Sequence, residues 1–235
     1  MVKKLMLGII PAFILFSCGN DDDGVSANGP IITTEVQLGE FSAFELEGVG
    51  DVTIVTDDFN SVQITTHENI VDLVTVGITE DKLSIGLSQN VRDVEELSFT
   101  VYTSGPLDLV ELTGVGNISY PGPVSSLDFA VMLDGVGNIT VGGLTSSNVT
   151  ARLKDVGNIS LSGTTASLDY LLEGVGDISG FGLVGEVGDV TLQGVGNIQV
   201  HASDTLIVSH NGVGQIQYRG QPIIVGDTEN VVQNN

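Results

Sequence analysis

A polar side chain closes each copy of a short glycine-rich motif, and these side chains have the spacing that could support chemistry. The motif is GVGNI or a close variant, with its polar position at Asp51, Asn117, Asn138, Asn158, Asp177, Asn197 and Gln215. Oxygen ligands that recur at fixed intervals can bind calcium, as they do in acidic nine-residue repeats. Here the interval is close to twenty residues and most of the side chains are neutral Asn. The pattern therefore favours a structural ladder of stacked amide and carboxylate side chains at Asp51, Asn117, Asn138, Asn158, Asp177 and Asn197.

Metal and cofactor chemistry is the alternative to that ladder. The carboxylates Asp51 and Asp177 are the strongest candidates for a calcium ligand among the motif residues. A body without cysteine excludes a disulfide framework and a Cys-based zinc site. We predict no metal site and no cofactor, with calcium at the corners as the open alternative.

Other reactive residue types form no recognisable catalytic set. The histidines are His67, His201 and His210, and no GxSxG nucleophile motif is present. We place His67 in a loop and interpret His210 as a core or capping residue in the last repeat. Arg152 and Lys154 flank Leu153 and point outward, either as charge balance on an acidic face or as a ligand contact. Thirty acidic residues always offer carboxylate pairs, so spacing alone cannot select a glycosidase pair. We predict that the protein is not an enzyme.

The composition excludes one class of partner. The 235 residues include 30 acidic and 7 basic ones, which gives a formal net charge of −23. A chain with this charge repels polyanions, so a nucleic-acid binder is excluded. The hydrophobic content of 41% is enough to form a core, so wholesale disorder is excluded too.

The elements that position the motif are short strands. From Asn117 onward the polar positions are 21, 20, 19, 20 and 18 residues apart. Apolar residues stand five and seven positions before each polar residue, as at Leu133 and Val131, and such alternation predicts strands. A twenty-residue unit cannot bury its apolar face alone, but stacked copies form a continuous core. We predict an all-β, single-domain parallel β-helix of six to eight coils, with the valines inside and the amides aligned at the bends.

Two segments depart from the regular repeat. The step from Asp51 to Asn117 is 66 positions, which leaves room for three longer coils without the motif, with broad loops over 52–102. The pentapeptide at 186–190 mimics the motif, but its residues belong to the strand before Asn197, so Asp189 is a coincidence. We predict that the tail from Arg219 caps the last coil and that 226–235 are flexible.

The N-terminus has the pattern of a processing segment. Lys3 and Lys4 precede an apolar run over 5–16 that is too short to span a bilayer. The following Ser17-Cys18 resembles the lipobox of bacterial lipoproteins, which implies lipid on Cys18. An ordinary secretory signal with an incidental cysteine is the alternative. The acidic run at 21–23 resembles a surface-export signal, or is simply the start of a solvated linker.

We therefore divide the chain into a signal peptide (1–17), a lipidated acidic linker (18–30), a β-helix domain (31–225) and a flexible tail (226–235). Loss of residues 1–17 leaves 5 basic and 30 acidic residues, or a net charge of −25.

The repeat resembles the head GIN domain family of bacterial adhesins, a domain of unknown function. The resemblance rests on the opening over 41–54 and on the recurring GxG[ND][IV] motif, and it covers about residues 38–220. It implies a right-handed parallel β-helix, and Gln215 departs from the family pattern in the last coil.

Together these features predict a lipoprotein of the outer membrane, exposed on the cell surface or facing the periplasm. We expect an adhesin, or a module that binds carbohydrate, an extracellular glycan or a host or matrix protein. A structural envelope protein that anchors or spaces partners is the second possibility, and a polysaccharide lyase or glycoside hydrolase is the third.

Overall fold

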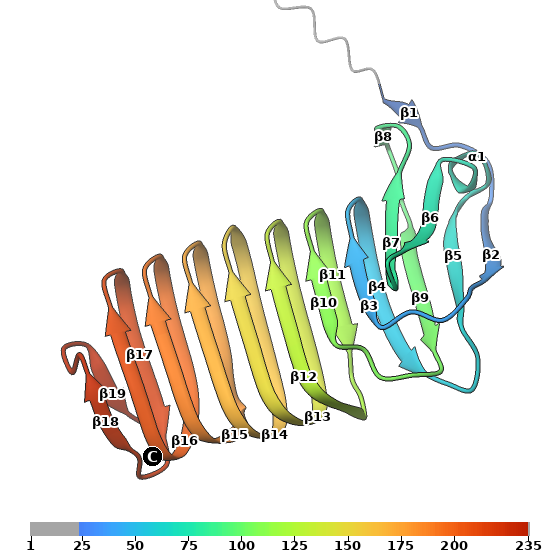
Figure 1. Ribbon diagram of the computed structural model, residues 1–235. Coiled ribbons are helices and arrows are strands. Elements are labelled where there is room, and N and C mark those ends of the chain that lie inside the picture. The colour runs from blue at the N-terminus through green and yellow to red at the C-terminus, as the bar shows by residue number, and fades with distance from the viewer. Residues whose placement is uncertain (1–23, 235) are drawn as a thin grey trace, which may run out of the picture.

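The repeated segments stack as the turns of a parallel β-solenoid (Figure 1). The computed structural model describes residues 24–234, with 72% strand, 2% helix and about six turns of roughly 20 residues each. This confirms the predicted all-β, single-domain class. The most regular turns are single bent strands, namely β13 (Val136–Leu153), β14 (Val156–Leu172), β15 (Val175–Leu192) and β16 (Val195–His210).

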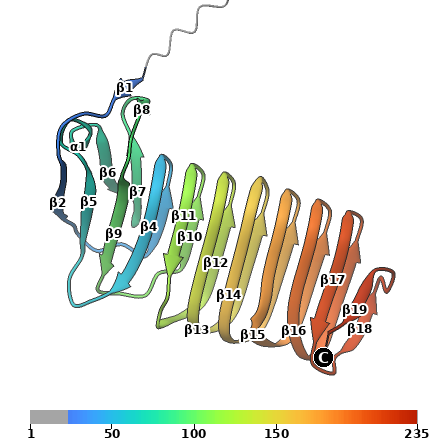
Figure 2. The ribbon, with the colours of Figure 1, turned by 180° about the vertical axis from the view of Figure 1, so that it is seen from behind.

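The register between turns is set by the glycine motif. Asn138 of β13 pairs with Asn158 of β14, and every motif residue from Val136 to Ile139 pairs with its equivalent one turn later. The motif corners therefore lie in a row along one edge of the solenoid, as both views show (Figures 1 and 2). The preceding turns are completed by β10 (Leu109–Leu112), β11 (Val115–Tyr120) and β12 (Val124–Leu133).

The second glycine of each motif is required by backbone geometry. Gly157 has a φ of +150°, and a Cβ added there would lie 1.7 Å from the carbonyl oxygen of Gly137 in the previous turn. Side chains are excluded by both the angle and the close approach of the neighbouring backbone. The first glycine is also closely approached, since a Cβ at Gly114 or Gly174 would lie 1.8 or 2.0 Å from a carbonyl oxygen of the previous turn. One corner nevertheless accommodates a side chain in this slot, that of Asp155.

The core follows the predicted alternation. The positions five residues before the corner are fully buried at Leu46, Leu112, Leu133, Leu153, Leu172 and Leu192. The positions that precede each corner by seven residues are also buried, at Phe44, Val110, Val131, Ala151, Tyr170, Val190 and Val208. One continuous apolar column therefore fills the solenoid.

The segment between the first two corners was predicted wrongly as three motif-free coils. β4 (Val49–Thr56) pairs directly with β11, and Asp51 lies opposite Asn117. Between these corners the chain leaves the stack after β4, folds over its first turn and returns at β10, so the two corners are neighbours. β3 (Ala43–Leu46) is in register with β10 in the same way.

This inserted segment and the preceding strand β2 (Ile31–Gln37) together form a cap with antiparallel pairing. β7 (Lys82–Leu87) lies parallel to β3, and β9 (Leu97–Thr103) lies parallel to β4. Beyond them the pairing becomes antiparallel, through β6 (Val74–Thr79) on β7, β5 (Ser61–His67) on β9, and β2 on β5. Antiparallel strands cannot continue a parallel coil, so the cap ends the solenoid on this side.

Part of the predicted linker is structured. β1 (Val25–Ser26) pairs with β8 (Val91–Arg92) beside the cap. His67 ends β5 and is 8% exposed, so the loop assignment was wrong. Its Nδ1 lies 3.0 Å from the Gly29 carbonyl oxygen, and Nε2 accepts from the Glu95 backbone N–H at 3.4 Å. The short helix α1 (Glu68–Val71) follows directly.

The C-terminal end is also more ordered than predicted. After β17 (Val213–Arg219), β18 (Ile223–Gly226) pairs with β16 and β19 (Val231–Gln233) pairs with β17. The segment 226–234 thus forms a last partial turn in place of a flexible tail. Asp227 accepts a hydrogen bond from the His210 backbone N–H at 2.9 Å, which attaches this segment to the final coil.

We expect Tyr170→Phe to raise the free energy of unfolding by about 1 kcal/mol. The Tyr170 side chain is fully buried, and its hydroxyl has no hydrogen-bond partner among residues 24–234. Removing the hydroxyl removes the cost of keeping it away from water. Urea unfolding followed by circular dichroism measures the change, and a destabilised variant would contradict the expectation.

Candidate functional site: the corner edge

The polar residues of the motif form a hydrogen-bonded column along the corner edge. The Asn117 side-chain amide donates to Asp51 Oδ1 at 2.8 Å, Asn138 donates to Asn117, and Asn158 donates to Asn138 at the same distance. Asp177 has no side-chain donor, and its backbone N–H donates to Asn158 Oδ1 instead at 3.1 Å. Asn197 then donates to Asp177 through both its backbone and its side chain.

The last corner continues the column in a reduced form. The Gln215 backbone N–H donates to Asn197 Oδ1 at 3.1 Å, while its side chain bonds to Gln217. The longer side chain of Gln therefore ends the side-chain ladder at this corner.

The two carboxylates of the column do not meet. Asp51 and Asp177 are four corners apart, which is about 19 Å at the usual strand spacing. Among residues 24–234, no group of three or more His, Cys, Asp or Glu side chains could hold a metal ion. The oxygens at these corners accept hydrogen bonds from their neighbours in the column.

The motif valines form a second column on this edge, outside the core. This corrects the expectation that the valines lie inside. The exposed fractions are 47% for Val49, 49% for Val115, 47% for Val136, 49% for Val156, 52% for Val175, 49% for Val195 and 67% for Val213. Each valine pairs in register with the next, so we call this column the valine ridge.

Acidic side chains flank the valine ridge. Six carboxylates lie within two residues of a ridge valine, and Lys154 is the single cation so placed, which leaves five uncompensated negative charges. The carboxylates belong to Glu47, Asp51, Asp134, Asp155, Glu173 and Asp177. The edge is therefore apolar along its crest and negative on its sides.

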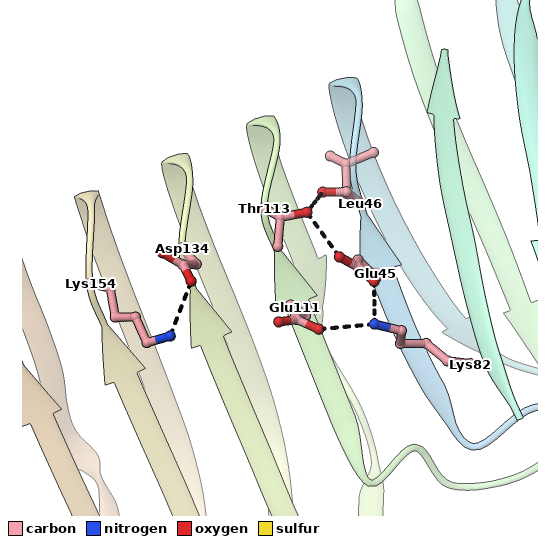
Figure 3. Close-up of polar contacts among 7 residues, drawn as sticks. All are labelled: Glu45, Leu46, Lys82, Glu111, Thr113, Asp134 and Lys154. Carbon is pink, nitrogen blue, oxygen red and sulfur yellow. Dashed lines mark hydrogen bonds and ion pairs between the residues drawn. The ribbon is translucent and has the colours of Figure 1, made fainter. Parts of the chain in front are cut away.

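The two basic residues singled out from the sequence are both ion-paired. Lys154 Nζ lies 3.1 Å from Asp134 Oδ2 in the preceding turn (Figure 3). Arg152 lies 3.3 Å from Asp169 on the following strand. All four paired side chains remain between 33% and 51% exposed.

A partly buried ion cluster joins the cap to the solenoid near the same edge (Figure 3). Lys82 of β7 forms ion pairs with Glu45 of β3 and with Glu111 of β10. Glu45 is 8% exposed and accepts a hydrogen bond from the Thr113 hydroxyl at 3.0 Å. The hydrogen bond from Lys82 to Glu45 is the main cause that raises the pKa of Lys82 above its ordinary value of 10.5.

We expect the protein to lose stability as the pH rises above about 10. Ion pairing raises the pKa of Lys82, and burial raises the pKa of Tyr170 above its ordinary value of 10.0. In both cases the folded chain retains a proton that the unfolded chain releases, so the free energy of unfolding falls with pH. The contribution of Lys82 is complete below 10.5 and disappears as the pH passes its raised pKa.

Urea unfolding at a series of pH values from 8 to 11.5 measures this slope. The slope should become shallower in Tyr170→Phe, which cannot ionise at this position. An equally steep slope in that variant would show that the tyrosine does not contribute.

Two cavities lie where the cap meets the first turns. One of about 480 Å³ is lined by Phe41, Pro106 and three carboxylates, Glu40, Asp81 and Asp108. The other, of about 430 Å³, begins at the N-terminal end of the valine ridge and is lined by Val49, Val115, Leu87, Val91 and Glu47 among others. We call this second cavity the ridge-end cavity.

The histidines do not converge on a common site. His210 Nε2 lies 3.0 Å from the Gly214 carbonyl oxygen, so this half-buried residue bonds to the corner of the last turn. His67 lies in the cap and His201 on β16. The 186–190 segment lies within β15 and forms no corner, as predicted for Asp189.

Sequence reasoning missed a second ladder at the opposite bend. Ser126, Ser146 and Thr165 are in register, and each hydroxyl lies within hydrogen-bond distance of the carbonyl oxygen two residues later, at 2.8 to 2.9 Å. Ser146 and Thr165 also lie close to a carbonyl oxygen of the preceding turn. The sequence signal for this ladder is weak. The hydroxyl residue follows the polar corner residue by nine positions at Ser126, eight at Ser146 and seven at Thr165, and this changing spacing conceals the repeat.

Residues 1–23, including Cys18 and the predicted signal peptide, lie outside the described residues. In the part of the chain that is described, no helix is long and apolar enough to cross a membrane.

Solved structures of bacterial proteins share this fold. A protein described as a putative adhesin from Bacteroides fragilis is 25% identical, with a TM-score of 0.82 over 89% of this chain and 96% of that one. A putative lipid binding protein from Parabacteroides distasonis is 17% identical, with a TM-score of 0.65 over 90% and 99%. A putative adhesin from the same species is 21% identical, with a TM-score of 0.60 over 90% and 99%.

No curated protein matches this chain. A family model does match residues 40–222, and its description is "putative auto-transporter adhesin, head GIN domain". The match covers the first corner, the inserted cap and all later corners. The chain therefore belongs to this head GIN domain family.

Proposed function

We propose that the protein is a lipid-anchored surface adhesin, held in the outer membrane through Cys18, that binds an extracellular glycan or a host or matrix protein. The observation that carries the proposal is the row of seven in-register corners, which repeats the same outward side chains along one edge. Such an edge suits an extended partner that makes many modest contacts.

The charges support binding over catalysis. Arg152 and Lys154 are ion-paired, and Lys82 is held by two glutamates, so an acidic polysaccharide would have to displace a carboxylate from each of these cations. The corner carboxylates Asp51 and Asp177 stand far apart and act as hydrogen-bond acceptors. Family membership points in the same direction, because the family is described as adhesins.

The location is tested by protease treatment of intact cells. A surface adhesin should be digested, and Cys18→Ser should release the protein from the membrane fraction. Protection from the protease in intact cells, with digestion after the outer membrane is opened, would favour the envelope-spacer alternative.

The binding role is tested with the purified chain on glycan and matrix-protein arrays. Retention without release of reducing sugar is expected of an adhesin. Sugar release would support the hydrolase alternative, and absence of retention together with a co-purifying envelope protein would support a spacer.

A further inference from the structure

The valine ridge is an exposed apolar feature that the fold does not need. A β-branched residue suits the strand that begins at this position, but threonine would serve the backbone equally well. All seven corners nevertheless carry valine, at exposed fractions between 47% and 67%. The result is a straight apolar crest whose side chains recur at about 4.8 Å and which is about 29 Å long.

Recognition at the ridge must use side chains, since its backbone is already paired. The Val115 N–H donates to the Gly48 carbonyl oxygen, and Val136 and Val156 donate in the same way to Gly114 and Gly135. The later ridge valines repeat this bond at 2.8 to 2.9 Å. A partner therefore cannot add a strand here by main-chain hydrogen bonds.

The charges beside the ridge select the chemistry of the partner. The flanks carry six carboxylates and one ammonium group, and the ammonium of Lys154 is paired with Asp134. A second copy of this chain would bring five more uncompensated negative charges to the interface. A phospholipid surface without net positive charge would desolvate these carboxylates with no compensating charge. A partner with cations on both sides of an apolar stripe complements the edge.

The ridge-end cavity adds an anchor point. Val49 and Val115 belong both to the ridge and to the wall of this 430 Å³ cavity, and Leu87 and Val91 supply further apolar wall. Glu47 is exposed and lies in the same lining. A large apolar side chain at one end of the partner could enter here while a neighbouring cation meets Glu47.

We propose that the valine ridge and the ridge-end cavity form a docking site for a cationic amphipathic α-helix. The helix lays its apolar stripe on the valines and directs lysine or arginine side chains to the carboxylates on either side. At a rise of 1.5 Å per residue, about 20 helical residues match the 29 Å crest. The partner is a separate polypeptide, so this proposal does not depend on lipidation or on glycan binding.

The test uses the purified full chain and a fluorescent 20-residue helix of leucine and lysine with one apolar face. The comparison peptide has the same composition in scrambled order, so it has the same charge without the apolar stripe. Fluorescence anisotropy should show tighter binding of the patterned helix. Equal binding of the two peptides would overturn the proposal, because it would show attraction by charge alone.

Variants locate the site. The ridge variant combines Val136→Thr, Val156→Thr and Val175→Thr and should weaken binding about tenfold or more. The control variant combines Val184→Thr and Ile207→Thr, which change exposed apolar residues outside the ridge, and should leave binding unchanged. Should the ridge variant not fold, Glu47→Gln with Glu173→Gln provides an independent test and should weaken binding and reduce its salt dependence. Undiminished binding in either of these folded variants would overturn the proposal.

The other occupants are tested on the same variants without peptide. Sedimentation of the wild-type chain as a dimer that the ridge variant abolishes would assign the ridge to a second copy. Binding to phosphatidylcholine vesicles that the ridge variant abolishes would assign it to a bilayer. Either result would overturn the helix proposal. A monomer whose vesicle binding is absent or is unchanged in the ridge variant leaves the ridge free for the helix, as the proposal expects.

Discussion

Gly157→Ala should destabilise the protein by roughly 3–5 kcal/mol and prevent folding at physiological temperature if the wild type is only marginally stable. The φ of +150° strains any residue with a Cβ, and the new atom would lie 1.7 Å from a backbone oxygen of the previous turn. That oxygen belongs to Gly137, which is itself a corner residue, so it can move only if the stack opens. Urea unfolding followed by circular dichroism measures the loss.

Gly77→Ala is the matched control for this prediction. Gly77 also lies in a strand, β6, but a Cβ there would meet no atom within 4 Å, and its φ is outside the strained region. The control should keep wild-type stability to within about 0.5 kcal/mol. Equal loss in the two variants would indicate a general effect of glycine replacement and refute the role of corner geometry.

Lys82→Ala should destabilise the protein by about 1–3 kcal/mol. The substitution leaves Glu45, which is 8% exposed, without the cation that neutralises it, while Glu111 remains nearby as a second negative charge. The expected loss of stability is smaller than for a fully buried ion pair because the Lys82 side chain is 36% exposed. Because the pair joins β7 to β3, the loss should appear first as increased hydrogen exchange in the cap.

A rescue variant separates charge from packing at this cluster. Adding Glu45→Gln to Lys82→Ala removes the unpaired charge and keeps an acceptor for the Thr113 hydroxyl. The double variant should recover most of the lost stability. Lys154→Ala breaks an ion pair between two well-exposed side chains, so it should leave the melting temperature unchanged. A double variant no more stable than Lys82→Ala would argue against the buried charge as the cause.

The regular part of the fold could be predicted because the same pattern of apolar and polar residues recurs in each turn. Leu133, Leu153 and Leu172 occupy equivalent positions, so the strand alternation is visible several times and each copy supports the others. The amide column was predictable for the same reason, since Asn117, Asn138 and Asn158 recur at nearly constant steps. A single strand of this kind would have been ambiguous.

The parts that could not be predicted lack this redundancy. The cap occurs once, and nothing local in residues 52–102 shows that the chain turns antiparallel and returns beside β4. The exposure of Val156 was missed because periodicity does not apply inside the corner, where the φ of Gly157 alters the direction of successive side chains. His67 was misplaced because its partners, Gly29 and Glu95, are remote in sequence.

Because Asp51 and Asn117 lie opposite each other on paired strands, the solenoid can change in length without altering its cap. The cap leaves and rejoins the stack between these two residues, and the last partial turn pairs with β16 and β17. The structures that close the two ends of the solenoid are therefore independent of the number of turns between them. Each turn contacts mainly its two neighbours. Duplication or loss of one twenty-residue unit between Val136 and Leu192 therefore changes the reach of the molecule in steps of about 4.8 Å and leaves both closures intact.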